Sequence, residues 1–340
     1  MEFKLELDRK CCPDCKCEEI VPYRTYETCE NGLRTIFKCT QCQKCFSETK
    51  NTFMEGIRKP LSAVAQVIKA RTEGIGVNAT CRVYDISKNT LLDWERKLVP
   101  LKDAFLLYAL LHTFLQQEIE GDELYTKVKE KVPVEDCEGW TIVLMDRASR
   151  FIWVLDCGEK DQKLFLGAMQ IFKELIEQTE DISLLTDGER RYGNILFEIC
   201  HEVIKSGKPG RPPKVLPEGV CVRVKNKGAQ EHKKGPKRPK YQAPQSEHPN
   251  TNSHLEDKDI HANHVEAFNA SLRRRLSAYT RKANTYAKGK DHLQRALDMY
   301  WLVHNFIRLH WTTKKIPAAV LGIVKPWFSF TDLLMAQLLT

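Results

Sequence analysis

The sequence has no long uninterrupted apolar run. Its longest, Ala104 to Leu111, is too short to cross a bilayer, for which a helix needs about 20 apolar residues. The opening stretch, MEFKLELDRK, carries both signs of charge and lacks the apolar segment of a secretion signal. The sequence also lacks a nucleophilic serine or cysteine motif. We therefore expect a cytoplasmic protein with no membrane partner and no covalent protein intermediate.

Cysteine, by contrast, is plentiful. The chain of 340 residues holds 13 cysteines, and they are concentrated before residue 46. Nothing points to export, where disulfides form, and in a reducing compartment such a cluster favours metal ligation. The length allows two or three domains, and the net charge of +8 is modest, so the position of the basic residues matters more than their number.

Residues 1–55 are predicted to form a zinc ribbon. Two CxxC pairs, Cys12 with Cys15 and Cys39 with Cys42, have the spacing of a four-cysteine zinc site. The residues between them are rich in Tyr, Thr, Ile and Phe, so short strands are expected there, and Phe46 would pack against the second pair. Cys45 is the main rival ligand, and free structural cysteines are the alternative. A module this small has little core, so zinc would hold it folded.

Residues 56–99 are predicted to form a helix-turn-helix DNA-binding domain. Helical periodicity covers 61–71, a short helix is expected at 79–84, and Ser87 can cap a third helix that reaches Leu98. Lys88, Asn89 and Thr90 would then face bases or phosphates. A three-helix packing unit without DNA contact is the alternative. The apolar helix expected at 100–117 would be a linker or would pair two copies of the chain.

Residues 118–340 are predicted to form a mixed α/β catalytic domain. Asp122 lies within its first strand and Asp187 follows its fourth, where sites form in such sheets, although an Asp-Gly pair is also an ordinary turn. The expected strands are 119–128, 140–146, 150–156 and 182–186, and the expected helices are 161–177 and 189–204.

A basic insertion, 205–258, interrupts this domain. Between Lys205 and Pro244 the only acids are Glu218 and Glu231, and the segment SGKPGRPPK, which contains Arg211, can lie along a phosphate backbone. A solvated basic loop is the alternative. Residues 220–224 could add a strand.

The stretch HANHVEAFNASLRRRL, 261–276, reads as a helix with two distinct faces. Glu266, Asn269 and Arg273 share one face, followed by Arg274, while an apolar face holds Val265, Phe268, Leu272 and Leu276. An acid beside arginines suits a metal ion that must sit next to phosphate. An ordinary amphipathic helix is the alternative. His264, on another side of the helix, is a minor candidate for a DNA contact. A long helix is expected at 291–310.

The three acids Asp122, Asp187 and Glu266 can converge if two lie on strands and one on a helix that crosses the sheet. Oxygen ligands select Mg²⁺ or Mn²⁺, and two such ions about 4 Å apart support an in-line phosphoryl displacement. Asn269 and Arg273 would hold the phosphate or the scissile strand.

The order of these motifs resembles that of bacterial and archaeal transposases of the insertion-sequence-one family. The resemblance covers nearly the whole chain, and its specific parts are CPDC with KCTQCQKCF, GDEL, LLTDG, and NHVEAFNASLRRRL followed by YWLVHNFIRLH. It implies an RNase H-like domain that cuts and joins DNA with Mg²⁺, with Asp122, Asp187 and Glu266 as its DDE triad. It also implies that the ribbon and helix-turn-helix bind terminal inverted repeats, and that a homodimer or higher multimer forms on terminal-repeat and target DNA at the nucleoid.

The chain departs from the family in two respects. Typical members fuse two reading frames, whereas this is one continuous chain, and the basic insertion is longer than in the shortest members. Two other functions stay open: a DNA-binding regulator whose nuclease domain is vestigial, and a structure-selective nuclease without strand transfer.

Overall fold

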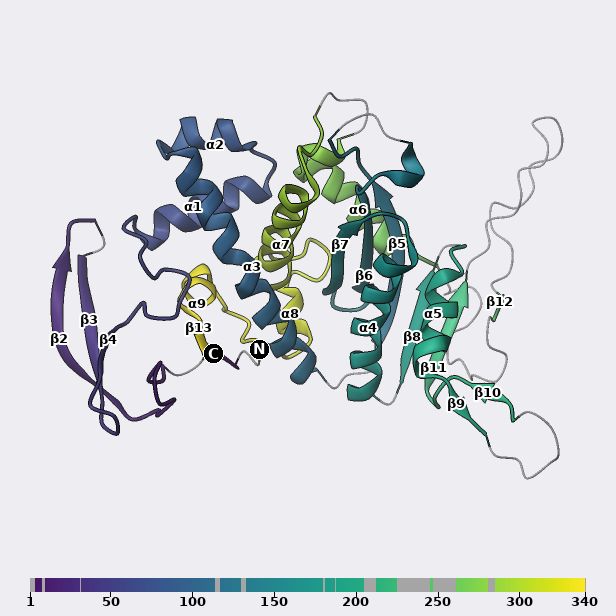
Figure 1. Cartoon of the computed structure of the whole chain (residues 1–340), viewed down its shortest axis with the longest axis horizontal. Helices are drawn as coiled ribbons and strands as arrows, with labels where there is room; N and C mark the ends of the chain where they lie inside the picture. Colours follow the sequence, from purple (N-terminus) through teal and green to yellow (C-terminus); the bar gives the residue numbers. More distant parts are fainter. Residues whose placement is uncertain are drawn as a thin grey trace. The chain divides into compact units, whose positions relative to one another are not determined.

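The computed structural model describes residues 4–7, 10–30, 32–113, 117–129, 133–179, 181–186, 188–204, 212–224, 245–246, 261–280 and 285–339. The chain divides into two compact units, Met1–His112 with Asp298–Thr340, and Thr113–Leu297 (Figure 1). This grouping differs from the expected boundaries, because residues 298–340 join the first unit and not the domain predicted from residue 118. Among the described residues, no helix is long and apolar enough to cross a membrane.

The first unit begins with a small antiparallel sheet in the order β2-β3-β4, formed by Ile20–Thr28, Gly32–Cys39 and Cys45–Ser47. The predicted strands between the two cysteine pairs are therefore present. Strand β2 is exposed at every position between its two ends, so the sheet has no apolar layer of its own. Its core consists of Cys12, Cys39 and Phe46 with a few partly buried neighbours. Phe46 thus packs at the cysteines, as predicted.

Three helices follow, α1 (Leu61–Thr72), α2 (Val77–Tyr84) and α3 (Lys88–Leu111). Ser87 caps α3 as predicted, because its hydroxyl accepts the Thr90 N–H at 3.0 Å. A buried ion pair of 2.8 Å between Arg71 and Glu95 joins α1 to α3. The presence of three helices agrees with the sequence prediction. That these helices bind DNA stays a prediction.

Helix α3 corrects one expectation. Two helices were predicted, one ending at Leu98 and one starting at Pro100, yet α3 runs through Pro100 without a break. Proline removes one helical hydrogen bond and often ends a helix. Here Leu98, Leu101 and Phe105, spaced three and four residues apart, are all buried on one side. Burial of that side stabilises the continuous helix more than the proline weakens it.

The end of the chain returns to the start of the first unit. After α7 (Lys290–Phe306), α8 (Pro317–Val320) and α9 (Phe330–Met335), strand β13 (Gln337–Leu339) pairs with β1 (Lys4–Glu6). The Gln337 amide brackets the backbone of Cys11, accepting its N–H and donating to its carbonyl, each at 2.9 Å. The last residues therefore support the segment that carries the first cysteine pair.

The second unit is built on a sheet in the order β12-β11-β8-β5-β6-β7. Its strands are β5 (Gln117–Tyr125), β6 (Trp140–Asp146), β7 (Ile152–Gly158), β8 (Ile182–Thr186), β11 (Val220–Val224) and β12 (Gln245–Ser246). A separate pair is formed by β9 (Glu202–Val203) and β10 (Lys214–Val215). The mixed α/β prediction is confirmed, and three strands have the predicted bounds.

Strand directions determine which residues share an edge of this sheet. Strand β5 is parallel to β8, and β8 is parallel to β11. Strand β6 is antiparallel to both β5 and β7, so β7 runs in the same direction as β5. The carboxyl ends of β5, β7, β8 and β11 therefore lie at one edge, which we call the carboxyl edge.

Helices cover both faces. Helices α4 (Gln162–Gln178) and α5 (Arg191–Cys200) lie together on one face (Figure 1). Gly121 of β5 lies beneath α5, because a Cβ there would sit 3.8 Å from the Tyr192 ring and 3.1 Å from Leu144. Helix α6 (Asn263–Arg275) contacts the alternate residues of β5, Glu120 and Asp122, and so lies on the other face.

Two glycines give a stability test of this unit. A Cβ at Gly139 would lie 1.8 Å from the Thr126 carbonyl oxygen, whereas a Cβ at Gly167, in α4, would meet nothing within 4 Å. We expect Gly139→Ala to destabilise the unit by roughly 2–3 kcal/mol through overpacking. Gly167→Ala should stabilise it by about 0.5–1 kcal/mol through helix propensity. Calorimetric melting of both variants checks the pair, and equal melting temperatures would contradict the packing described here.

Candidate functional site

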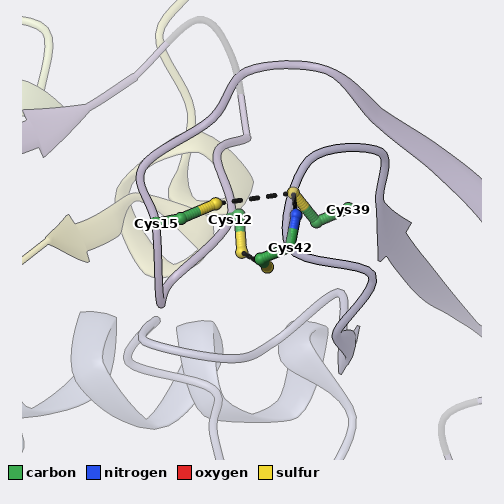
Figure 2. A group of neighbouring side chains, drawn as sticks. All are labelled: Cys12, Cys15, Cys39 and Cys42. Carbon is green, nitrogen blue, oxygen red and sulfur yellow. Dashed lines mark hydrogen bonds between the residues drawn. The ribbon is translucent and has the colours of Figure 1, made fainter.

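Four cysteines come together at the base of the small sheet. The Sγ atoms of Cys12, Cys15, Cys39 and Cys42 all lie within 4.8 Å of one another (Figure 2). The Cys12–Cys42 and Cys15–Cys39 pairs are 3.5 Å apart, too far for a disulfide bond of about 2.05 Å. In a tetrahedral zinc site with Zn–S bonds of about 2.3 Å, the sulfur atoms are about 3.8 Å apart. The cluster has the dimensions of such a site.

The two CxxC loops repeat the same backbone geometry. In the first loop the Lys16 N–H donates to the Cys12 carbonyl at 3.0 Å, and in the second the Gln43 N–H donates to the Cys39 carbonyl at 3.1 Å. Lys16 and Gln43 both have a φ of 62°. Each loop therefore makes one tight turn, closed by a left-handed residue, that points two sulfur atoms to the same side.

The chemistry of the four sulfur atoms suits a metal. The Cys42 N–H lies 3.5 Å from the Cys39 sulfur, and this hydrogen bond lowers the pKa of Cys39 to about 6. The thiolate, which is the form that binds zinc, is thereby favoured at Cys39, whereas burial and the neighbouring thiols raise the pKa of Cys15 to about 12. Zinc binding at the cluster would therefore release protons from the remaining thiols. The predicted set of four cysteines is confirmed as a cluster that could bind zinc. The rival Cys45 lies on β4, is exposed and is not part of the cluster.

This cluster gives a test by metal content. We expect Cys39→Ser to lose the zinc and unfold the small sheet, because the sheet has little apolar core to hold it without metal. Cys45→Ser is the matched control and should keep both the metal and the fold. Elemental analysis of the purified variants measures the zinc per chain. A Cys39→Ser protein with a full zinc complement would contradict the ligand set.

A second group of polar residues gathers at the carboxyl edge of the large sheet. Asp122 and Glu123 belong to β5, Lys160 follows β7, and Glu189 and Arg191 follow β8. The Lys160 ammonium lies 3.1 Å from Glu123 and 3.7 Å from Glu189. Arg191 donates to both oxygens of Glu189, at 2.9 and 2.7 Å. Connections from three parallel strands thus meet where ligands bind in sheets of this kind.

Helix α6 brings its polar face to the same strand. The Asn269 side chain donates to Asp122 Oδ2 at 2.8 Å, and Asn269 is only 1% exposed. Glu266 lies three residues earlier, on the same face of α6, and is exposed. Two of the three predicted acids therefore belong to elements joined by a direct hydrogen bond.

A buried carboxylate fixes the start of α6. Glu120 is fully buried, and its Oε2 accepts the backbone N–H groups of His264 and Val265, each at 2.9 Å. These are the second and third residues of a helix that has no side-chain cap of its own. Glu120 therefore caps α6 from β5 and places a negative charge at the positive end of the helix dipole.

The other oxygen of Glu120 completes the network. Oε1 accepts from Arg147 Nε at 2.9 Å and lies 2.7 Å from His264 Nδ1. Arg147 also donates to the His261 carbonyl at 2.7 Å and to Glu118 at 3.0 Å. Because both oxygens already receive donors, the group of Glu120, His261 and His264 is better suited to hold the helix than to hold a metal, although its ligand atoms lie within 4.8 Å of one another.

Two contacts align α6 with β5. From His264 and Val265 to Asn269 the helix rises about 7 Å, and from Glu120 to Asp122 the strand extends about 7 Å. The two elements therefore run side by side in the same direction. As a result, α6 carries Glu266 and Asn269 towards the carboxyl edge.

The network predicts that two glutamate substitutions differ in their cost to stability. Glu120→Gln puts an amide donor among N–H donors and leaves Arg147 without its buried partner, which we expect to cost about 3–5 kcal/mol. Glu118→Gln, at a carboxylate whose side chain is 28% exposed, should cost less than about 1 kcal/mol. Thermal melting gives the two values, and hydrogen exchange of the His264 and Val265 amides locates the change. Similar costs for both variants would contradict the role given to Glu120.

The structure places the other predicted residues as follows. Asp187 and Arg211 lie outside the described residues, although Thr186, directly before Asp187, pairs with Gly121, directly before Asp122. Lys88 and Asn89 are exposed at the start of α3, and Thr90 is half-buried. Arg273 is half-buried and Arg274 is exposed at the end of α6. Their contacts with DNA stay predictions.

Two of the residues predicted to contact DNA have partners within the chain. Asn269 is buried, and its amide donates to Asp122. His264, the minor candidate, bonds Glu120. Sequence periodicity placed both residues on polar sides of the helix, but it could not show that β5 supplies their partners.

Sequence reasoning also missed Tyr192. This residue is fully buried in α5, and burial, followed by the negative charge of Glu123, raises its pKa well above 10. Its hydroxyl therefore stays protonated. Its position five residues after Asp187 was the one hint in the sequence that it lies near the predicted site. Nothing in the sequence showed that its ring would reach β5.

No protein-family model matches the chain, and no curated protein compared with it gives a significant match. The resemblance drawn from the sequence therefore depends on its motifs alone.

Proposed function

We propose that the chain is a DNA transposase of the DDE type, which cleaves and joins DNA strands with Mg²⁺ or Mn²⁺. The observation that supports this most is the hydrogen bond from Asn269 to Asp122. It joins the strand that carries the first predicted acid to the helix that carries the third. The Glu120 network holds these two elements in register, so Glu266 is kept near the same edge.

The donor set fits a hard divalent cation. Asp122 and Glu266 supply carboxylate oxygens, and the Asn269 side-chain oxygen is buried and has no hydrogen-bond partner among the described residues. Oxygen ligands of these kinds are those that Mg²⁺ and Mn²⁺ prefer. Asp187, the remaining proposed ligand, follows Thr186, which is paired beside Gly121. Bound there, the cations would polarise a phosphodiester and lower the pKa of the attacking water or hydroxyl.

The protein residues would orient the DNA around this edge. Arg273 and Arg274 follow Glu266 on α6, where their positive charge suits the phosphates of the strand to be cut. On the side of α5, Lys160 and Arg191 are paired with Glu123 and Glu189, so they hold these carboxylates in place and do not supply a free positive charge. Glu120 and Asn269 do not contact DNA in this proposal, and act by holding α6 and Asp122 in place.

The first unit would bring the DNA to the catalytic unit. In the proposal the cysteine cluster holds a zinc ribbon, and α1, α2 and α3 form a helix-turn-helix whose residues Lys88, Asn89 and Thr90 read terminal inverted repeats. Paired ends require at least a homodimer on DNA. The same helices would serve equally well in a DNA-binding regulator, which is the second candidate.

Glu266→Gln tests the proposal. The substitution keeps the shape of the side chain but removes the charge that holds a cation, so we expect strand cleavage to fall at least about 1,000-fold, a loss of roughly 4 kcal/mol in transition-state stabilisation. DNA binding should change less than about twofold. The substrate is a labelled duplex that carries the ends of the element encoding the chain, assayed with Mg²⁺.

The outcomes separate the candidates. A wild-type chain that binds the duplex but never nicks it would exclude the transposase and favour the DNA-binding regulator. Nicked products without joined strands would leave a nuclease that lacks strand transfer. A Glu266→Gln variant as active as the wild type would contradict the assignment of the acid.

A further inference from the structure

A short backbone contact beyond the end of β5 gathers three side chains on one outer side. Val128 and Ala287 form a parallel bridge, in which the Ala287 N–H donates to the Lys127 carbonyl at 3.3 Å. Both bridging side chains are buried. Because side chains alternate along extended backbone, the neighbours Lys127, Tyr286 and Lys288 lie on the opposite, outer side. We call these three residues the lysine–tyrosine group.

Two ammonium groups contact one aromatic ring in this group. The Nζ atoms of Lys127 and Lys288 lie 4.8 and 4.3 Å from the centroid of the Tyr286 ring. Lys288 also donates to the Tyr286 hydroxyl at 3.3 Å. Tyr286 is 36% exposed, and Lys288 is exposed, so solvent and a ligand can reach the group.

The charges of this group are not balanced within it. Among the described residues, neither Lys127 nor Lys288 pairs with a carboxylate. The electron-rich face of the Tyr286 ring attracts each cation but neutralises neither. Two like charges are thus held close together, which is unfavourable unless an anion joins them.

The group adjoins the end of α6. The short 3-10 turn η3 (Ser277–Tyr279) directly follows that helix. Thr126 and Thr285, the residues before Lys127 and Tyr286, each donate a hydroxyl hydrogen bond to a carbonyl of this turn. Both segments of the group are therefore tied to the end of α6, at the carboxyl edge where β5 also ends.

We infer that the lysine–tyrosine group binds the phosphodiester backbone of DNA beside the cleavage site and so fixes how the strand lies along α6. The inference rests on the proposed function, because that function places DNA at the carboxyl edge. From Glu266 to Arg275 the helix rises about 14 Å. Phosphates of one duplex strand advance about 3.4 Å each along the axis. A strand that follows α6 would therefore meet the group about four nucleotides from the cut.

The double variant Lys127→Gln with Lys288→Gln tests the inference through the salt dependence of DNA binding. The zinc-loaded full chain is titrated with a labelled duplex without Mg²⁺ at several salt concentrations. Each lost phosphate contact lowers the slope of log affinity against log salt by about 0.9, so we expect a slope about 1.8 shallower and a dissociation constant roughly 10-fold higher at about 0.1 M salt. A terminal-repeat duplex and an unrelated duplex of equal length should change alike, because phosphates carry no sequence information.

Two other double variants are the controls. Lys127→Arg with Lys288→Arg keeps both charges and should keep the slope. Lys163→Gln with Lys173→Gln removes the same charge from α4, on the face of the sheet opposite α6, and should also leave the slope unchanged. The melting temperature of the Lys127→Gln, Lys288→Gln protein should stay the same or rise, because two like charges are removed. A fall of several degrees would show a structural role and overturn the inference.

The outcomes distinguish the inference from the proposed function. A Lys127→Gln, Lys288→Gln protein with the wild-type slope overturns the inference and leaves the proposed function standing. A change confined to the terminal-repeat duplex, or matched by the α4 pair, also overturns it, because the contact would then not be one of this group with phosphate. If the slope falls as expected but the wild-type chain never nicks DNA with Mg²⁺, the group binds DNA phosphates and the proposed transposase function fails alone.

Discussion

The buried carboxylate of Glu120 is the interaction on which the second unit depends most. It caps the start of α6, pairs with Arg147 and contacts His264, all from the interior of the sheet. Burial of a charge is unfavourable unless every oxygen finds a donor, and here both do. The arrangement fixes one helix on one strand in one register. Asn269 can then reach Asp122, and Glu266 is carried to the same edge.

The first unit depends on a different constraint. Its small sheet exposes nearly all of β2 and buries little beyond cysteines and Phe46. A sheet with so little apolar contact is only marginally stable by itself. The four cysteine sulfur atoms therefore take the place that an apolar core has in larger domains. The end of the chain adds support through Gln337, which holds the backbone of Cys11. The two units thus gain their order from unlike sources, one from a cluster of cysteines and one from a buried ion network.

Local pattern in the sequence predicted much of this, for reasons that can be stated. Strands β6, β8 and β11 are short apolar runs bounded by turns, so their limits could be read directly, and the CxxC spacing picked out the four clustered cysteines. The sequence pattern could not show which residues from distant segments would contact one another. Glu120 looked like an ordinary strand residue, Asn269 and His264 like surface contacts, and Tyr192 like a helix core residue.

Helix α3 shows the same limit of local sequence signals, because here a local signal predicted a helix end that does not occur. Pro100 signals a helix end locally, yet burial of Leu98, Leu101 and Phe105 on one side keeps the helix intact. The placement of residues 298–340 with the first unit was equally invisible to periodicity, because it depends on contacts between the two ends of the chain.

The central claim is that acids from separate segments share one cation at the carboxyl edge. Anomalous diffraction from a crystal of the chain soaked in Mn²⁺ tests it most directly. The account predicts manganese density within about 2.2 Å of oxygen atoms from both Asp122 and Glu266. A crystal in which those carboxylates point apart, with no manganese between them at saturating concentration, would contradict it.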